Sequence, residues 1–243
     1  MSVLRDRVAL VTGAGAGLGR AVALGLARAG ARVVALSLHA SELEEVGATA
    51  AAEGLPLDTV AADVGDAERT EAVAAETLAR HGRLDVLVNN AGIIAVKPIE
   101  DTTPAEWDRI VATNLRGPFL YSRAFIPAMK ARGDGLIVNV TSESGVRGFT
   151  GESAYCPSKF GLEGLTRTLA LELEPFGVRV VSVTPGKAMR TPMSETTYDA
   201  AARAEWVDPA ELAPGFVALA ASRDPGISGG RYDAWRLARE GLG

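Results

Sequence analysis

The sequence is poor in aromatic residues, in cysteine and in clustered basic residues, and each shortage excludes a class of protein. Aromatic residues make up 5% of the 243 residues, too few for an aromatic-rich binding surface. The single Cys156 excludes an internal disulfide and fits a reducing, cytoplasmic location. There are 25 Lys and Arg residues against 30 Asp and Glu residues, and no segment gathers the basic ones into a patch. No nucleic-acid partner is therefore expected.

Long hydrophobic runs are also missing. A membrane-spanning helix needs about 18 consecutive apolar residues, and the uninterrupted apolar stretches of this sequence are far shorter. The opening MSVLRDRVALVTG places a charge after four residues and does not follow the pattern of a signal peptide. We expect no membrane partner, and no metal site.

What the sequence does contain is an alternation of short apolar runs with helical patterns. The runs are nearly continuous in apolar residues, which is typical of parallel strands buried on both faces. The expected strands are Val8–Val11, Val33–Leu36, Leu57–Ala61, Leu84–Val88, Leu136–Val140 and Val178–Val183. The expected helices lie at about 17–29, 41–53, 66–81, 104–131, 153–174 and 209–222.

Capping residues support these helix boundaries. Gly30 and Gly54 follow two of the helices, where a left-handed residue commonly ends a helix. The expected N-caps are Asp66, Thr103 and Ser153, with Pro104 at a first helical position. The alternation predicts one α/β domain over residues 1–243, a Rossmann-type doubly wound parallel sheet with helices on both faces. Residues 185–208 have the weakest periodicity and are expected to form a substrate loop with one short helix.

A glycine-rich turn, Thr12-Gly13-Ala14-Gly15-Ala16-Gly17-Leu18-Gly19, joins the first strand to the first helix. Glycines let a phosphate approach the backbone, and the helix N-terminus supplies N–H groups and partial positive charge. The alternative is a glycine-rich turn without a ligand. The strand–turn–helix context favours nucleotide binding.

With this TGxxxGxG spacing the sequence resembles the short-chain dehydrogenase/reductase family over about residues 5–230. Asn89-Asn90-Ala91-Gly92 follows the fourth strand, Asp63-Val64 the third, and Pro185-Gly186 the sixth, as in the family. The resemblance implies an NAD(P) cofactor held by Gly13, Gly15, Gly17, Leu18, Gly19, Ser37, Asp63, Val64, Asn90, Ala91, Gly92, Tyr155, Lys159, Pro185, Gly186 and Thr191.

Two polar residues four apart in a helical stretch form the candidate catalytic pair. Tyr155 and Lys159 share one helix face. A tyrosine hydroxyl, with an ordinary pKa of about 10, is a poor base at neutral pH. A nearby ammonium favours the phenolate, so that the tyrosine can exchange a proton with a substrate oxygen. By itself this spacing would indicate only an ordinary exposed pair on a helix. The glycine-rich nucleotide loop earlier in the sequence favours a catalytic pair instead.

Two further residues complete the set that the resemblance implies. Ser142 follows the Leu136–Val140 strand and would hold the substrate oxygen beside the tyrosine, with Thr141 and Ser144 as rival hydroxyls. Asn114 matches the family's helix asparagine, which implies a kink and a water-linked proton path toward Lys159. The alternative for Asn114 is a helix irregularity with a local backbone bond.

The implied reaction is hydride transfer between a nicotinamide and a carbon that bears oxygen. Lys159 would also hold the nicotinamide ribose. The expected substrate is a small or medium alcohol/carbonyl pair. Reduction of a 3-oxoacyl thioester is one frequent activity of such sequences, and oxidation of sugars, polyols and hydroxysteroids are others. From a different class, the chain would be a nucleotide-binding regulator without chemistry, but Ser142, Tyr155 and Lys159 are all present.

The choice of nucleotide depends on the end of the second strand. An acidic residue there binds the ribose 2′-hydroxyl of NAD and repels the 2′-phosphate of NADP. Ser37 stands where the family's acidic residue usually stands, which favours NADP(H) slightly over NAD(H). A phosphate clamp is missing too, because Leu38 and Ala16 occupy positions that are often basic, and only His39 could contribute.

The sequence departs from the family near its carboxyl end. Four residues instead of three separate Pro185-Gly186 from Thr191, and the segment that follows is shorter than the family's lid. A short lid indicates an open pocket or one completed by another subunit. The candidate pocket residues are Val146, Phe149, Met189, Met193, Tyr198 and Trp206, each of which could instead pack in the core or the lid.

The last residues, 231–243, replace the family's closing strand with a charged, amphipathic segment. They are expected to cover a neighbouring subunit, with Trp235 as an anchor, or to form a loosely packed tail. Members of the family are usually tetramers or dimers through their long helices. We therefore expect a homotetramer or homodimer.

Overall fold

The computed structural model describes residues 2–197, 203 and 205–242. Its centre is a parallel sheet of seven strands in the order β3-β2-β1-β4-β5-β6-β7. The strands are β1 Val8–Thr12, β2 Arg32–Ser37, β3 Leu57–Ala61, β4 Val86–Asn89, β5 Gly135–Val140, β6 Val178–Thr184 and β7 Arg231–Asp233. All the predicted strands are confirmed, and the chain is a single-domain α/β Rossmann fold.

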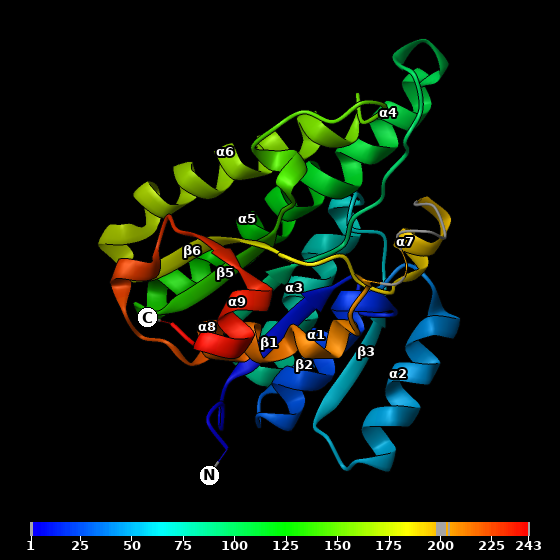
Figure 1. Cartoon of the computed structure of the whole chain (residues 1–243). Helices are drawn as coiled ribbons and strands as arrows, with labels where there is room; N and C mark the ends of the chain where they lie inside the picture. The colour runs from blue at the N-terminus through cyan, green and yellow to red at the C-terminus, as the bar shows by residue number, and fades with distance from the viewer. Residues whose placement is uncertain (1, 198–202, 204, 243) are drawn as a thin grey trace.

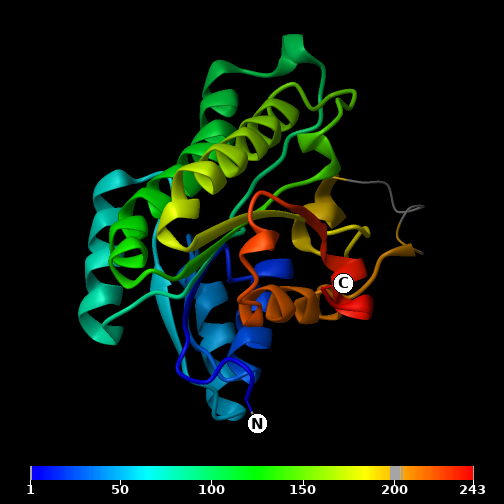
Figure 2. The same ribbon diagram turned by 90° about the vertical axis from the view of Figure 1, so that its left-hand side faces the viewer.

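Helices cover both faces of the sheet (Figures 1 and 2). On one face lie α1 Gly17–Arg28, α2 Ala40–Ala52, α8 Ala213–Ala221 and α9 Ala234–Glu240. On the other lie α3 Ala67–His81, α5 Gly117–Arg132 and α6 Tyr155–Leu173. Each helix layer buries its apolar side chains against the sheet, so the two faces form two separate cores. This double cover explains why the strands are nearly all apolar.

The order of the strands reverses beside β1. β1 pairs with β2 on one side, where Val11 lies opposite Ala35, and with β4 on the other, where Val11 lies opposite Val88. In open α/β sheets a ligand binds at the carboxyl edge next to such a reversal. The glycine-rich turn leaves β1 at this point.

Most of the predicted capping residues are confirmed. The Asp66 side chain accepts from the Arg69 backbone N–H, and Thr103 forms a capping box with Glu106 at the start of α4 Pro104–Val111. Ser153 is wrong as an N-cap, because α6 begins at Tyr155 after Ala154. The Ser153 hydroxyl instead lies 3.3 Å from the Thr102 hydroxyl.

The helix predicted over residues 104–131 is interrupted. Between α4 and α5 the backbone forms a π-helical turn, Ala112–Arg116, and Asn114 is fully buried within it. Its side chain bonds both backbone polar groups of Ile93. A π-turn in a helix commonly marks a functional site, and here it aims the Asn114 amide at the loop after β4.

The carboxyl-terminal segment is part of the domain. β7 extends the sheet, with Ser182 of β6 opposite Arg231, and α9 packs closely on α8. A side chain at Gly215 would come within 2.7 Å of the Ala234 carbonyl oxygen, which shows how near the two helices approach. The structure therefore differs from the loosely packed tail considered from the sequence. The strand β7 was not predicted from the sequence, because two of its three residues are charged and it therefore has no apolar run.

The described part of the substrate loop contains the short α-helix α7 Pro192–Thr197 and a bridge between Met189 and Val207. Tyr198, named above as a pocket residue, lies outside the described residues. No helix in the described ranges has the length and hydrophobicity that crossing a membrane requires.

Candidate active site

The glycine-rich turn is folded as a tight cradle above β1. Gly13 and Gly17 have φ of +64° and +52°, in the left-handed region that favours glycine. A side chain at Gly19 would lie 2.0 Å from the Gly13 carbonyl oxygen. Within the described part of the chain no side chain caps the N-terminus of α1, whose Leu18 is buried in the core beneath. The turn thus offers backbone N–H groups to an anion.

The Asn89-Asn90-Ala91-Gly92 segment is bound to this turn. The Thr12 hydroxyl accepts from the backbone N–H groups of Asn90 and Ala91, at 3.0 and 3.1 Å. The Asn90 amide donates to the carbonyl oxygens of Thr12 and Gly13. A side chain at Gly13 would lie 2.8 Å from the Ala91 Cα, so glycine is required for this approach. Thr12 was not predicted as a site residue. The available signal was its position at the start of the glycine-rich turn.

The far side of the cradle is formed by the ends of β2 and β3. Ser37 is buried, and its hydroxyl donates to a carboxylate oxygen of Glu42, in the first turn of α2, at 2.9 Å. After β3, the Asp63 carboxylate accepts from the Gly65 N–H while Val64 is buried in the core. Glu42 was not predicted, because it lies five positions after Ser37 in the sequence, on the following helix.

The predicted catalytic pair lies at the start of α6. Tyr155 and Lys159 are both buried, and the Lys159 Nζ lies 5.6 Å from the centre of the Tyr155 ring. The same ammonium donates to the Val140 carbonyl oxygen at the end of β5, at 2.9 Å. Burial lowers the pKa of Lys159 to about 8, against an opposing effect of the Glu163 carboxylate. The pair is therefore held at the carboxyl edge of the sheet, with a lysine that titrates near neutral pH.

Three hydroxyl groups compete for the role of substrate holder after β5. The Ser142 hydroxyl accepts from the Ser144 N–H at 3.2 Å and lies 3.3 Å from the Ser144 hydroxyl. Ser144 and Thr141 are buried, whereas Ser142 is half-buried. Ser142 is thus the most accessible of the three to a substrate.

Asn114 connects the catalytic helix with the loop after β4. Besides bonding the backbone of Ile93, its amide donates to the Ser158 hydroxyl at 3.0 Å. A side chain at Gly92 would lie 3.4 Å from the Asn114 Oδ1 and 3.6 Å from the Lys159 Nζ. Asn114, Gly92 and Lys159 therefore meet at one point, next to the cradle.

A buried charge lies one turn beyond Lys159 on α6. Glu163, one turn further along α6, accepts from the Ser182 hydroxyl at 2.9 Å and from Arg231 at 3.2 Å. Arg231 also donates to the backbone carbonyl oxygen of Ser142. The sequence contained a signal for Glu163, which continues the spacing of four from Tyr155 and Lys159. It contained none for Arg231.

The predicted substrate-side residues divide into two groups. The side chains of Val146, Phe149 and Met193 are substantially exposed, between 36 and 42%. Trp206 is buried and Met189 packs against the core. The first group is available to a ligand, and the second stabilises the loop.

The carboxyl side of the site is reinforced by the tail. Gly186 has φ of +76°, and a side chain there would overlap the Asp233 carboxylate. The Trp235 N–H donates to the Pro185 carbonyl oxygen at 3.2 Å. Thr191 caps α7 by accepting from the Ser194 N–H and lies beside Gly17. The extra residue before Thr191 therefore does not remove it from the cradle.

These residues fit a dinucleotide. The cradle could accept phosphate through backbone N–H groups, and the ends of β2 and β3 could flank an adenosine. Lys159, Pro185 and Gly186 would then border the nicotinamide. All the predicted positions lie at this one edge of the sheet, which is what a single extended ligand requires.

Comparison with known proteins agrees with this geometry. A family model described as short chain dehydrogenase matches residues 7–202. Trans-4-hydroxycyclohexanecarboxylate dehydrogenase of Sinomonas cyclohexanicum is 42% identical over 195 residues, covering 78% of this chain and 74% of that protein. Cyclopentanol dehydrogenase of Comamonas testosteroni is 40% identical over 204 residues, covering 82% and 80%. The crystal structure of a metagenomic short-chain oxidoreductase in complex with NADP superposes with a TM-score of 0.83, at 35% identity, covering 96% of this chain and 99% of that one.

The chain belongs to the short-chain dehydrogenase family. It is an NAD(P)-dependent oxidoreductase that interconverts an alcohol and a carbonyl compound. The regulator without chemistry, considered from the sequence, is set aside.

Proposed function

We propose that Tyr155 is the general acid/base of this reaction, with Ser142, Lys159 and Asn114 as its partners. The observation that carries the proposal is the burial of Tyr155 and Lys159 beside the end of β5, with the accessible Ser142 hydroxyl two residues further on. The bound nicotinamide supplies the hydride chemistry. Ser142 holds the substrate oxygen by a hydrogen bond, and Tyr155 gives or takes the proton at that oxygen. Lys159 supplies the positive charge that favours the phenolate.

Asn114 has a positioning role in this proposal. Its three hydrogen bonds join Ile93 to Ser158, one residue before Lys159. It thereby holds the catalytic turn of α6 against the cradle. The proton path implied by the family resemblance would run from this point to Lys159.

The cofactor contacts are part of the same proposal. Backbone N–H groups of the turn that contains Gly13, Gly15, Gly17, Leu18 and Gly19 bind the phosphates. The adenosine lies between Ser37 and the Asp63-Val64 pair, and Asn90, Ala91 and Gly92 line the floor. Lys159, Pro185, Gly186 and Thr191 surround the nicotinamide riboside.

We propose a small alicyclic secondary alcohol, or its ketone, as the substrate. Two relatives in the comparisons act on cyclopentanol and on a hydroxycyclohexane carboxylate. The exposed side chains of Val146, Phe149 and Met193 would supply apolar contact to such a ring. A 3-oxoacyl thioester, considered from the sequence, has less support because neither relative is named for such a substrate.

The experiment compares cyclopentanol, cyclohexanol and a 3-oxoacyl thioester as substrates of the purified protein. Reduced nucleotide formed or consumed is followed at its near-ultraviolet absorbance. The proposal requires turnover of a cyclic substrate, and turnover restricted to the thioester would contradict it. To assign the hydroxyl, Ser142→Ala is compared with Thr141→Val and Ser144→Ala. We expect Ser142→Ala to lower kcat/KM the most, since it alone removes the accessible hydroxyl.

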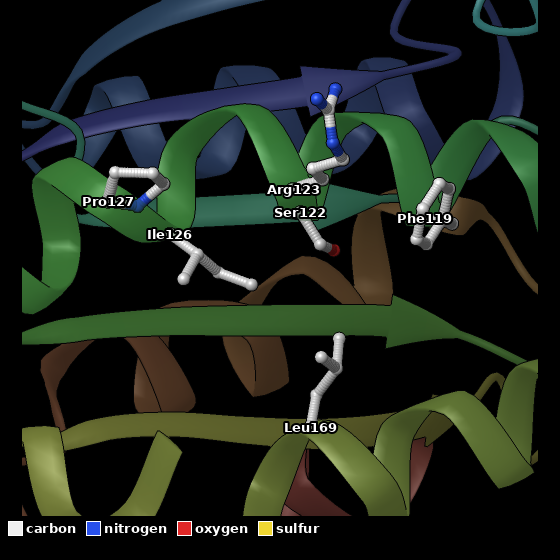
Figure 3. A pocket seen from close by; sticks show the side chains of 6 residues that line it. All are labelled: Phe119, Ser122, Arg123, Ile126, Pro127 and Leu169. Atoms are coloured by element: carbon white, nitrogen blue, oxygen red, sulfur yellow. The ribbon is translucent and has the colours of Figure 1, made fainter. Parts of the chain in front are cut away.

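We further propose that the chain assembles into a homodimer or homotetramer through α5 and α6. A shallow apolar groove of about 220 Å³ lies between these helices, and Ile126 and Leu169 point into it from opposite sides (Figure 3). Phe119, Phe160 and Leu171 are exposed on the same two helices. Sedimentation velocity tests the assembly, and a monomer at micromolar concentration would contradict it.

A reducing, cytoplasmic location remains part of the proposal. Cys156 is free and buried, and burial raises the pKa of its thiol, which keeps the thiol protonated. Fractionation of the producing cell tests the location.

A further inference from the structure

We infer that Glu42 selects the nucleotide and makes this enzyme prefer NAD(H) to NADP(H). The inference rests on the proposed nucleotide site. The preference for NADP(H) drawn from the sequence assumed that no acidic side chain reaches the end of β2. The structure does not meet that premise, because Glu42 reaches this point from α2.

The position of the carboxylate is fixed by two contacts. The Ser37 hydroxyl donates to the Glu42 Oε2 at 2.9 Å. On the other side, a side chain at Gly15 would lie 2.3 Å from the same oxygen and 2.7 Å from the Glu42 Cβ. Glu42 therefore lies between the end of β2 and the glycine-rich turn, where a Rossmann fold places the adenosine ribose.

The chemistry of this position is set by the Glu42 carboxylate. A carboxylate accepts hydrogen bonds and donates none, so it binds a ribose 2′-hydroxyl. A 2′-phosphate at the same point would place two anions side by side in a half-buried setting, which is unfavourable unless a cation intervenes. Ser37 supplies only a hydroxyl, and that hydroxyl is already directed at Glu42.

The neighbouring basic residues do not supply such a cation. Arg20 of α1 faces α2, but its guanidinium is bonded to Glu45 and to the Thr49 hydroxyl. His39 is exposed at the N-cap of α2, and Leu38 beside it is apolar and 59% exposed. The site is thus built from a carboxylate and a hydroxyl, and it matches the uncharged 2′-hydroxyl of NAD.

A purely structural role for Glu42 makes a different prediction. An acidic residue in the first turn of a helix favours that helix through its dipole, and this effect is the same whichever nucleotide is bound. Discrimination between the two nucleotides is therefore the readout that separates selection from helix stabilisation.

The test measures dissociation constants for NADH and NADPH by isothermal titration calorimetry, with no substrate present. Glu42→Gln keeps the size of the side chain and its capacity to accept from Ser37. Glu44→Gln, at an exposed position of the same helix, removes one charge and is the matched control. For the wild type we expect NADH to bind at least about tenfold more tightly than NADPH, the factor that one hydrogen bond to a charged group supplies.

In Glu42→Gln we expect NADPH to bind about tenfold more tightly than in the wild type and NADH several-fold more weakly. Glu44→Gln should leave both dissociation constants within about twofold of the wild-type values. If the wild type prefers NADPH, or if Glu42→Gln and Glu44→Gln give the same constants, the inference about Glu42 is overturned while the nucleotide site stands. If neither nucleotide binds to the wild type, the nucleotide site itself is wrong and the inference falls with it.

Discussion

Lys159 and Glu163 lie one turn apart on α6, and both are buried. Burial lowers the pKa of the lysine to about 8, and the glutamate carboxylate opposes that effect by favouring the charged ammonium. Glu163 is itself held by Ser182 of β6 and Arg231 of β7. The charge on Lys159 is therefore favoured by a carboxylate that is held by the last two strands of the sheet.

We predict that Glu163→Gln moves the alkaline limb of the pH profile to lower pH. Lys159 carries its charge below its pKa and loses it above, so wild-type kcat/KM should fall as pH rises through about 8. Removing the carboxylate removes the effect that raises this pKa, so the limb should move to lower pH. The measurement is kcat/KM for the nucleotide between pH 6 and 10.

The control for this experiment is Glu172→Gln, an exposed position on the same helix. It changes the net charge of the protein by the same amount and should leave the limb in place. A limb that stays near pH 8 in Glu163→Gln would show that the carboxylate does not act on Lys159.

Asn114 should contribute to stability as well as to the site. Asn114→Ala leaves the N–H and carbonyl of Ile93 and the Ser158 hydroxyl without this partner, in a position that is fully buried. Leaving buried polar groups unpaired costs about 1–3 kcal/mol each, and the effects are not additive. We expect the free energy of unfolding in urea to fall by about 2–4 kcal/mol.

Thr113→Ala, one residue earlier in the π-turn, is the comparison and should change the free energy of unfolding by less than about 0.5 kcal/mol. Equal losses in the two variants would mean that the turn, and not the Asn114 amide, determines the stability of this region.

Two glycines in helices should respond in opposite ways to replacement by alanine. At Gly19 the new Cβ would lie 2.0 Å from the Gly13 carbonyl oxygen, so Gly19→Ala must displace the turn that binds the phosphates. At Gly47, in the middle of α2, the new Cβ would lie 3.7 Å from Thr59, an ordinary contact. We expect Gly19→Ala to weaken nucleotide binding at least about a hundredfold, a loss of about 2.7 kcal/mol.

Gly47→Ala should bind nucleotide normally and raise the thermal midpoint by about 2–3 °C, because alanine favours a helix over glycine by up to about 1 kcal/mol. Calorimetric titration and a thermal melt of both variants are the measurements. Normal nucleotide binding by Gly19→Ala would show that the glycine-rich turn is not part of the binding site.

Much of the fold is readable from the sequence because the sheet is buried on both faces. Leu10, Val138 and Val180 belong to runs that are nearly continuous in apolar residues, and such runs predict buried strands. β7 was not predicted in this way, because two of its three residues, Arg231 and Asp233, are charged and make polar contacts. Arg231 bonds Glu163 and Glu143, and Asp233 caps α9.

From the residues alone, the site could be predicted only where its members follow a spacing along one element, and the family resemblance added Asp63, Asn114 and Ser142. Tyr155 and Lys159 share a helix face, and the glycines share a turn. Ser37 and Glu42 come from a strand and a helix, and only the turn between the two elements brings their oxygens together. The irregularity at Asn114 was expected from the asparagine itself and from the family resemblance, whereas the hydrophobic pattern gave no sign of it, because a single π-turn barely changes that pattern.

The most direct test of the account compares the wild type with Tyr155→Phe, using the cyclic alcohol that the wild type oxidises best. The substitution removes one hydroxyl and keeps the ring. The account predicts that kcat/KM falls by about a hundredfold to ten-thousandfold, while the dissociation constant for NADH changes by less than about threefold. Turnover by Tyr155→Phe at the wild-type rate would contradict the assignment of Tyr155 as the acid/base, and with it the central claim.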